Sequence, residues 1–515
     1  MATEDNPAAP GSGELSHSPG RPGNLRGRRT EWIFFIIWLC LCGLYLANAP
    51  ARLMLLIGAV ELLVAVILVA RAPKRALIFL TLVTHTGPVV RVQVPFVGML
   101  TFGDAYLAVL SGGVLLLFLL GARLRGGPLS ILIPLLLFLW ALTTFLSPDL
   151  RVVAPGAIAQ IQIALVYFLT LNLVETEDEA WKLLNWIGVT VLVGSCMHLV
   201  AFTQGRTLLL AMEGSGEGIY ALSERSEAAR AAVGSFFKTA FFYGSFPASC
   251  AAGIVLAVVG MAAAGRRLGR ARLLWAFVGF SALTSTLVSG NRTPLLAAGA
   301  VVIPYLLWSA LRSIRHRRHR SALLGTALSV LGLTAGGLWL QKRILSEDQL
   351  ARFQLMFRYA AETSMQDRFQ MWRAAWARLD QFPREFLVGL GPDVPQRGPA
   401  LPQVQRLMEF NQSIGVFSFH NFYIDVLYQN GIVFLSVMVG VLLWTMDGLQ
   451  RRLRKDAAGL AIVLLCALLT WCLTWTVHAT GWSKPVMILA ELMALSHLLI
   501  SGRLRPRRAD GGPSS

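Results

Sequence analysis

Charged residues are scarce in this sequence. Asp, Glu, Lys and Arg together make up 14% of the chain, whereas a soluble domain carries about 25%. Hydrophobic residues make up 55% instead. This balance excludes a soluble globular domain and predicts a polytopic membrane protein.

Cysteine is also rare, and its placement argues against two kinds of site. All six cysteines fall inside apolar runs and none lies in a predicted loop, so we expect neither a structural disulfide nor a zinc site. We expect no cofactor and no metal ion elsewhere in the chain. The six are Cys40, Cys42, Cys196, Cys250, Cys466 and Cys472.

A cleavable signal peptide is not expected either. Residues 1–30 are rich in Pro, Gly and Ser. The first apolar run begins at Trp32, which is too far into the chain and too long for the hydrophobic part of a typical signal peptide. We therefore expect residues 1–30 to form a disordered cytoplasmic tail.

Long apolar runs are what the sequence has in abundance. A spanning helix needs about 20 apolar residues, and about fourteen runs qualify. We predict an all-α polytopic membrane protein with helices 1–11 in residues 31–341 and helices 12–14 in 420–501. Between them, 342–419 would form a large periplasmic helical loop. A smaller outer loop is expected at 204–235 and a cytoplasmic tail at 502–515. The predicted spans are 32–49, 52–70, 76–93, 96–120, 128–147, 154–174, 181–203, 236–264, 273–290, 293–311, 321–341, 420–446, 458–478 and 485–501.

The basic residues orient these spans. A net charge of +18 is compatible with nucleic-acid binding, but more than half of the 46 Lys and Arg residues cluster in the two tails and in alternate short loops between apolar runs. Such clusters mark the cytoplasmic side of a membrane protein. The pattern predicts a membrane protein with both termini in the cytoplasm, in contact with membrane lipids and not with nucleic acid.

The large outer segment contains a predicted amphipathic helix. Met365, Phe369, Trp372, Trp376 and Leu379 recur at spacings of four, three, four and three residues, and Pro383 supplies a stop. The apolar stripe suits a helix lying on the outer leaflet. A helix packed against the spanning helices would show the same stripe, so both interpretations stay open.

The stretch from His420 to Gly431 stands where this polar segment meets the next apolar run. His420, Asn421 and Asp425 are polar groups at or just below the membrane surface, and His420 and Asp425 share roughly one helix face. Polar groups at such a depth tend to mark a site or a pathway. The simpler alternative is that His420 only caps the helix.

Two arginines are expected on the same side of the membrane as His420. Arg292 lies at the outer turn between spans 273–290 and 293–311, and Arg368 lies on the amphipathic helix. Guanidinium groups bind phosphate oxygens through paired hydrogen bonds, and a histidine accepts a proton near neutral pH. Such a set fits a lipid diphosphate donor and an attacking hydroxyl. The alternative for each arginine is an anchor to lipid headgroups.

These motifs together resemble the O-antigen ligase and O-antigen polymerase family. The resemblance covers roughly residues 228–446. In the turn before Arg292, Asn291 replaces the usual Ser, and Pro294 follows shortly after it. The matching motifs are His420-Asn421-x-Tyr423-(x)3-Leu427-(x)3-Gly431, Gly290-Asn291-Arg292, Arg368-(x)3-Trp372, Pro383, Gly389-x-Gly391 and Arg230-(x)3-Gly234.

The resemblance implies a membrane-embedded glycosyltransferase of the C type that acts in polysaccharide biosynthesis. It implies a glycan donor linked to undecaprenyl diphosphate and an inverting, metal-independent transfer. Arg292, Arg368 and Arg230 would bind the diphosphate, and His420 would activate the acceptor hydroxyl, with Asn421 and Asp425 in support. The acceptor would be lipid A-core of lipopolysaccharide for a ligase, another lipid-linked repeat for a polymerase, or a protein hydroxyl.

Two other functions were weighed against this one. A metal-dependent oligosaccharyltransferase needs an acidic pair in its first outer loop, and the loop 48–52 has no carboxylate. A lipid-linked glycan flippase or other transporter would account for charged or ionisable residues deep within spans. The residues of that kind are Glu61, His85, Asp104 and Glu491.

Overall fold

The structure is a computed structural model of the 515-residue chain. It describes residues 23–47, 49–85, 91–94, 98–121, 132–145, 150–203, 246–263, 271–288, 293–315, 332, 335, 363–390, 421–455, 459–476 and 486–505.

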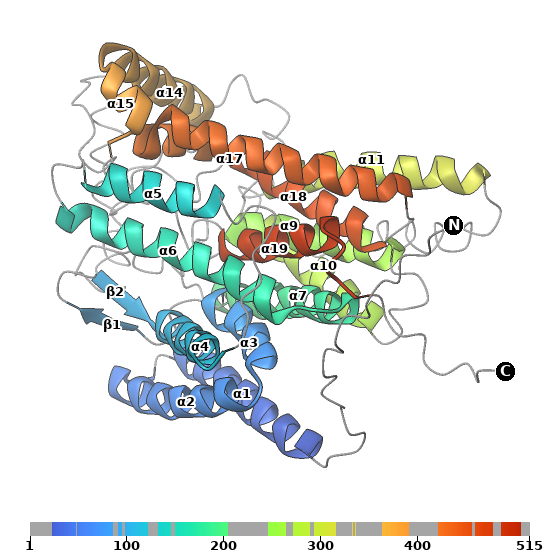
Figure 1. The fold of residues 1–515 in the computed structure, drawn as a ribbon. Helices are drawn as coiled ribbons and strands as arrows, with labels where there is room; N and C mark the ends of the chain where they lie inside the picture. Colours follow the sequence, from blue (N-terminus) through green and yellow to red (C-terminus); the bar gives the residue numbers. More distant parts are fainter. Residues whose placement is uncertain are drawn as a thin grey trace, which may run out of the picture.

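The described part of the chain is a bundle of helices that run side by side, with one β-hairpin at an end (Figure 1). Its N-terminal helices are α1 (Gly23–Leu46), α2 (Ala51–Arg71), α3 (Pro73–His85), α4 (Phe102–Leu119), α5 (Leu132–Phe145), α6 (Leu150–Leu173) and α7 (Glu177–Thr203). The later ones are α9 (Phe246–Ala263), α10 (Ala271–Val288), α11 (Thr293–Arg315), α14 (Thr363–Gln381), α15 (Pro383–Val388), α17 (Phe422–Lys455), α18 (Gly459–Trp475) and α19 (Val486–Ile500).

The helices agree with the predicted membrane spans. Each predicted span overlaps one of these helices except 321–341, of which the structure describes only residues 332 and 335; the predicted outer loop 204–235 lies outside the described ranges. Six helices are long and apolar enough to cross a membrane by length and composition, and five shorter helices are also apolar. The helical, multi-pass class of the protein is confirmed, while the number of crossings stays a prediction.

One stretch that the sequence analysis took for helix is a hairpin. Helix α3 ends at His85, and strand β1 (Arg91–Val94) pairs antiparallel with β2 (Gly98–Thr101) before α4 begins. The β1 sequence alternates polar residues with valine, which favours a strand. The Asp104 carboxylate then caps α4 by accepting the Thr101 N–H at 2.6 Å and the Thr101 hydroxyl at 2.8 Å. The spans predicted at 76–93 and 96–120 are therefore shorter than expected.

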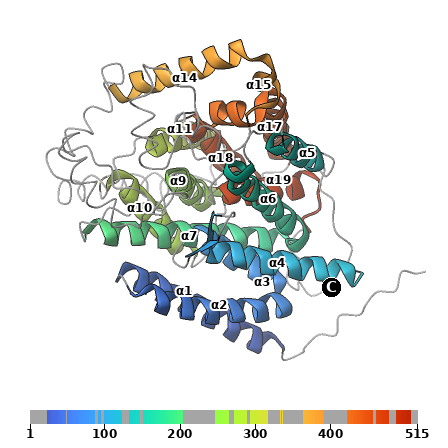
Figure 2. The ribbon, with the colours of Figure 1, turned by 90° about the vertical axis from the view of Figure 1, so that its left-hand side faces the viewer.

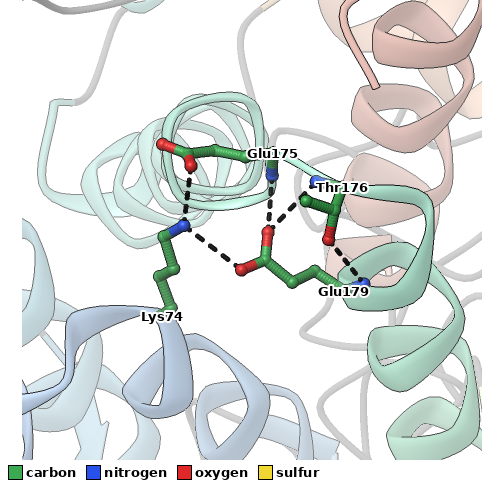
Figure 3. A network of polar contacts seen from close by, with 4 residues as sticks. All are labelled: Lys74, Glu175, Thr176 and Glu179. Carbon is green, nitrogen blue, oxygen red and sulfur yellow. Dashed lines mark hydrogen bonds and ion pairs between the residues drawn. The ribbon is translucent and has the colours of Figure 1, made fainter. Parts of the chain in front are cut away.

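A polar network ties three segments together at one end of the bundle (Figure 3). The Lys74 ammonium at the start of α3 contacts the Glu175 carboxylate at 2.9 Å and that of Glu179 at 3.2 Å. Glu179 also accepts the backbone N–H groups of Glu175 (2.8 Å) and Thr176 (3.2 Å). The chain after α19 joins here, because the Arg505 N–H donates to the Glu175 carbonyl at 2.9 Å.

This network agrees with the predicted pattern of alternate sides. With the N-terminus in the cytoplasm, the predicted spans place residues 71–75, 175–179 and 503–508 on the cytoplasmic side, and the structure brings the described residues of these segments together. At the start of α17, Asn421 contacts Thr476 at the end of α18, and both were assigned to the outer side. Which end of the bundle faces the cytoplasm stays a prediction.

A second polar chain crosses three helices inside the bundle. The buried His497 ring on α19 lies between the Tyr167 hydroxyl on α6 (2.5 Å to Nδ1) and the Thr445 hydroxyl on α17 (2.8 Å to Nε2). Because the Thr445 hydroxyl donates to the Val441 carbonyl, it accepts a hydrogen from His497 Nε2. Nδ1 is then free to accept the Tyr167 hydroxyl hydrogen, so both ring nitrogens of His497 and the hydroxyl groups of Tyr167 and Thr445 are paired.

Candidate functional site

The predicted site is organised around the first turn of α17. The Asn421 side chain caps this turn, because its Oδ1 accepts the backbone N–H groups of Tyr423 at 3.0 Å and Ile424 at 3.1 Å. Its Nδ2 donates to the Thr476 carbonyl at 3.0 Å, at the end of α18. Asn421 therefore acts as a helix cap and as a tie between α17 and α18.

Two aromatic residues strengthen the same tie. The Phe422 ring stacks on Trp475 of α18 with ring centroids 4.0 Å apart, and the Tyr423 hydroxyl donates to the Cys472 carbonyl at 3.2 Å. Asn421, Phe422 and Tyr423 together fix the position at which the chain enters α17. His420 is the preceding residue and lies outside the described ranges.

Asp425 lies one turn further along α17. Asp425 is buried, with 3% of its surface exposed, and its backbone N–H donates to the Asn421 carbonyl at 2.9 Å. The carboxylate is thus held inside the protein close to the cap. The predicted pairing of Asp425 with His420 stays a prediction.

Helix α17 is broken at Gly431, where the sequence analysis expected a continuous span. The backbone there has φ 78° and ψ 173°, a conformation that glycine adopts without strain. Gly389, after α15, has φ 77°. A Cβ on Gly431 would lie 2.3 Å from the Leu387 carbonyl oxygen, and a Cβ on Gly389 would lie 2.3 Å from that of Gln429. Two backbones therefore cross here at a distance that only glycine permits.

This crossing explains two glycines whose role the sequence analysis missed. Gly431 closes the His-Asn motif and Gly389 opens the Gly-x-Gly of the outer segment, so each was noted without a physical reason. The Leu390 N–H also donates to the Tyr428 carbonyl at 3.0 Å, which replaces a bond lost at the break. The two motifs form one structural unit.

The predicted amphipathic helix is α14, and it packs on α17 through α15 (Figure 2). Met371, Ala375 and Leu379 are its buried residues, and they form an apolar cluster with Leu427 and Tyr428 of α17. The helix ends before Pro383, as predicted, and Pro383 begins α15.

The predicted apolar stripe of α14 is only partly buried. Phe369 and Trp376 are each 50% exposed, whereas Leu379 is buried. Compared with the predicted stripe, the buried face of α14 is turned toward Met371 and Ala375. These residues are smaller than Phe369 and Trp376 and allow close packing on α17. The helix therefore packs on the bundle, as one of the two arrangements predicts, and also presents aromatic residues outward. The contact with the outer leaflet stays a prediction.

Only some of the predicted site residues lie in the described part of the chain. Asn421 and Asp425 are described in full, and Arg368 lies in α14, of which the backbone is described at that position. Arg230, Arg292 and His420 lie outside the described ranges. Arg292 immediately precedes Thr293, the buried first residue of α11.

The helices next to these residues are connected through α17 and α18. Helix α11 packs against α18, α18 packs against α17, and α17 carries α15 and α14. In Figure 1, α14, α15 and the start of α17 lie toward the end of the bundle where the hairpin β1–β2 lies. Helix α11, which begins just after Arg292, helix α14, which contains Arg368, and helix α17, which begins just after His420, thus belong to one packed assembly.

Acidic groups in other helices, buried or partly buried, bear on the transporter alternative. Asp104 caps α4 and also accepts a hydrogen bond from Gln162 Nε2 at 2.8 Å, and Glu491 accepts one from the Thr81 hydroxyl. These contacts give both groups structural roles. Glu61 differs, because it is fully buried and, among the described residues, its carboxylate oxygens have no hydrogen-bond partner.

The apolar helices and the capped, glycine-crossed assembly of α14 to α18 are those of a multi-pass helical membrane protein. Residues 277–439, about a third of the chain, match the family model described as O-Antigen ligase. The match supports the O-antigen ligase family, as the sequence motifs predicted, and it includes Arg292, Arg368, His420, Asn421 and Asp425 but not Arg230. No curated protein matches the chain.

Proposed function

We propose that this protein transfers a glycan from undecaprenyl diphosphate to an acceptor hydroxyl at the periplasmic face of the bacterial inner membrane. The observation that carries the proposal is the O-Antigen ligase match over 277–439, which includes α14, α15 and the first half of α17. The family supports membrane-bound glycan transfer in general, with a lipid-linked glycan and an acceptor as partners. The donor lipid, the side of the membrane and the acceptor are part of the proposal.

In the proposed reaction, the acceptor hydroxyl oxygen forms a bond to the anomeric carbon while the bond from that carbon to the diphosphate oxygen breaks. The leaving diphosphate takes the bonding electrons, and the attacking hydroxyl gives its proton to His420. This displacement inverts the anomeric configuration and needs no metal ion. Arg292, Arg368 and Arg230 bind the diphosphate, because guanidinium groups remain charged and match phosphate geometry.

The structure supports this proposal by the rigidity it gives to the segments involved. The Asn421 cap and the stacking of Phe422 on Trp475 fix the start of α17. The crossing of Gly389 and Gly431 attaches α15, and through it α14, to the same helix. Groups that are held in place before substrate binds stabilise a transition state without reorganising.

A lipid-linked glycan flippase is the second candidate, and Glu61 is the observation that favours it. A buried carboxylate without a partner inside a membrane bundle is a marker of an ion or substrate pathway. Asp104 and Glu491, by contrast, have local structural partners. Glycan transfer remains the function that the motifs and the matched segment favour. Protein O-oligosaccharyl transfer uses the same donor site and differs only in the acceptor.

The proposal is tested with the purified full-length protein in liposomes that contain undecaprenyl diphosphate-linked glycan. One reaction receives lipid A-core, a second receives no acceptor beyond the donor itself, and a third receives an acceptor peptide. We expect a new glycoconjugate and the release of undecaprenyl diphosphate in at least one reaction. Movement of the donor between leaflets without any transfer product would instead establish the flippase.

A further inference from the structure

We propose that α14 and α15 form an interfacial helix pair, with Phe369, Trp376 and Leu387 inserted in the lipid leaflet at the end of the bundle where α17 begins. This inference concerns a membrane-surface contact and does not depend on the chemistry that the protein performs. It rests on the exposed apolar residues of α14 and α15, on the depth of α15 in the membrane, on the nearby lipid-facing surface of α17, and on the basic residues of the pair.

The exposed surface of the pair carries an unusual share of large apolar residues. In α14, Phe369 and Trp376 are each 50% exposed, although Met371 and Leu379 on another face of the same helix are 2% and 1% exposed. Leu387 in α15 is 51% exposed. Phe382, between the two helices, is 47% exposed. Large apolar side chains that gather exposed on one short stretch of chain point to an interaction surface.

The depth of α15 follows from its contact with the break in α17. Arg451, in the basic cluster at the other end of α17, stands about 20 residues after Gly431, which corresponds to about 30 Å of helix. That length is the thickness of the hydrocarbon core, so Gly431 lies close to its boundary. The Leu387 carbonyl lies against Gly431 and the Leu390 N–H donates to Tyr428. Helix α15 is therefore held at the level of that boundary.

The apolar surface of the pair continues into the lipid-facing surface of α17. Val433, two residues beyond Gly431, is 44% exposed, and Leu443 and Trp444 further along the same helix are 61% and 41% exposed. In a membrane-spanning helix such outward apolar residues contact lipid. The Leu387 backbone touches Gly431, so the exposed residue Leu387 lies at the point of α17 where this surface begins.

Basic residues next to the exposed aromatics identify lipid as the occupant. Arg373 on α14 and Arg384 on α15 are exposed. Tryptophan and arginine concentrate at the membrane–water boundary, where the indole ring meets both phases and the guanidinium group meets lipid phosphates. A protein partner would not require this apolar surface to lie at the depth of the hydrocarbon boundary, whereas contact with a lipid leaflet requires that depth.

The test measures the depth of single spin labels in the full-length protein. Single cysteines are introduced as Phe369→Cys, Trp376→Cys and Leu387→Cys after the six native cysteines are replaced by alanine. Matched controls are Gln370→Cys and Ala377→Cys, which are exposed positions on a different face of α14. The labelled proteins are placed in nanodiscs of phosphatidylethanolamine and phosphatidylglycerol, and collisions with oxygen and with a water-soluble nickel chelate are compared.

We expect the ratio of oxygen collisions to nickel-chelate collisions to be several-fold higher for spin labels at the three test positions than for labels at the two control positions. Equal, water-like accessibility at both sets would overturn the proposal. Low accessibility of the test positions to both reagents would also overturn it, because it would indicate burial against a protein partner or a second copy of the chain.

If the cysteine-free protein does not fold, the native chain offers a second measurement. Brominated phosphatidylcholine quenches tryptophan that lies in the bilayer, so wild type and Trp376→Phe are compared in such vesicles. The part of the tryptophan fluorescence that is missing in Trp376→Phe should be a part that the brominated lipid quenches in the wild type. An unquenched contribution from Trp376 would contradict the interfacial position.

Discussion

Replacing Gly431 by alanine tests whether the crossing of α15 and α17 holds the outer segment in place. The new Cβ would lie 2.3 Å from the Leu387 carbonyl oxygen and 2.7 Å from the Gly389 nitrogen, both backbone atoms that cannot rotate away. The backbone conformation at φ 78° is also strained for any residue with a Cβ. Backbone strain costs about 1–3 kcal/mol and overpacking a further 1–3 kcal/mol, so we expect a loss of about 2–6 kcal/mol in the stability of this contact.

The assay is thermal unfolding of the purified protein in one detergent, together with limited proteolysis of the outer segment. Gly431→Ala should lower the midpoint of unfolding and speed cleavage near α15. Gly440→Ala is the matched control, because Gly440 lies in the same helix and an added Cβ there meets nothing within 4 Å. That control should be neutral or stabilising by up to about 1 kcal/mol, since alanine favours the helix.

A double variant sharpens this test. Gly389→Ala should destabilise as Gly431→Ala does, and the combination should cost clearly less than the sum, because either change already breaks the same contact. Equal stability of Gly431→Ala and Gly440→Ala would refute the crossing. Additive losses in the double variant would refute the claim that the two glycines serve one contact.

Three further outcomes are expected. Arg292→Lys should lose activity by roughly tenfold to a hundredfold, because it keeps the charge but loses a paired hydrogen bond worth about 1.5–3 kcal/mol; full activity would indicate a headgroup anchor. Tyr167→Phe should destabilise the bundle by about 0.6–1.7 kcal/mol, because one interhelical hydrogen bond is lost, and His497→Leu by about twice as much, because two are lost. Unfolding midpoints measure both losses, and equal losses would argue against the hydrogen-bonded chain Tyr167–His497–Thr445. A reporter fused after Arg508 should lie in the cytoplasm and one fused near Gln396 outside; both on one side would overturn the topology.

Much of the fold could be predicted because lipid restricts the backbone to few choices. A long apolar run in a membrane must satisfy its own hydrogen bonds, so the run from Ala51 to Arg71 has no alternative to the helix α2. The hairpin β1–β2 was missed for the opposite reason. Its four-residue strands are short, and the alternation of valine with Arg91 and Gln93 is lost when hydropathy is averaged over a span.

Features that depend on tertiary contact could not be predicted in the same way. A single glycine in a helical pattern costs about 1 kcal/mol and does not by itself signal a break, so Gly431 became meaningful only beside Leu387. The buried face of α14 follows Met371 and Ala375 because α17 packs there, while the larger Phe369 and Trp376 remain exposed.

For the candidate site, the sequence identified the segment rather than the role of each residue. Asn421 was predicted to support catalysis, and the structure assigns it a helix cap and a bond to Thr476. Asp104 was weighed as part of a transport pathway and instead caps α4. In both cases the deciding partners are backbone groups, whose positions are not visible in a sequence.

In the proposed reaction, His420 is the base that activates the acceptor hydroxyl, and replacing it is the most direct test of the mechanism. Transfer from purified lipid-linked donor and binding of that donor are measured side by side for wild type and His420→Ala. We expect transfer to fall by about 10²–10⁴, the usual contribution of a positioned base. Donor binding should be retained, because the arginines bind the diphosphate. A loss of only a few-fold in transfer, or a parallel loss of donor binding, would contradict the claim.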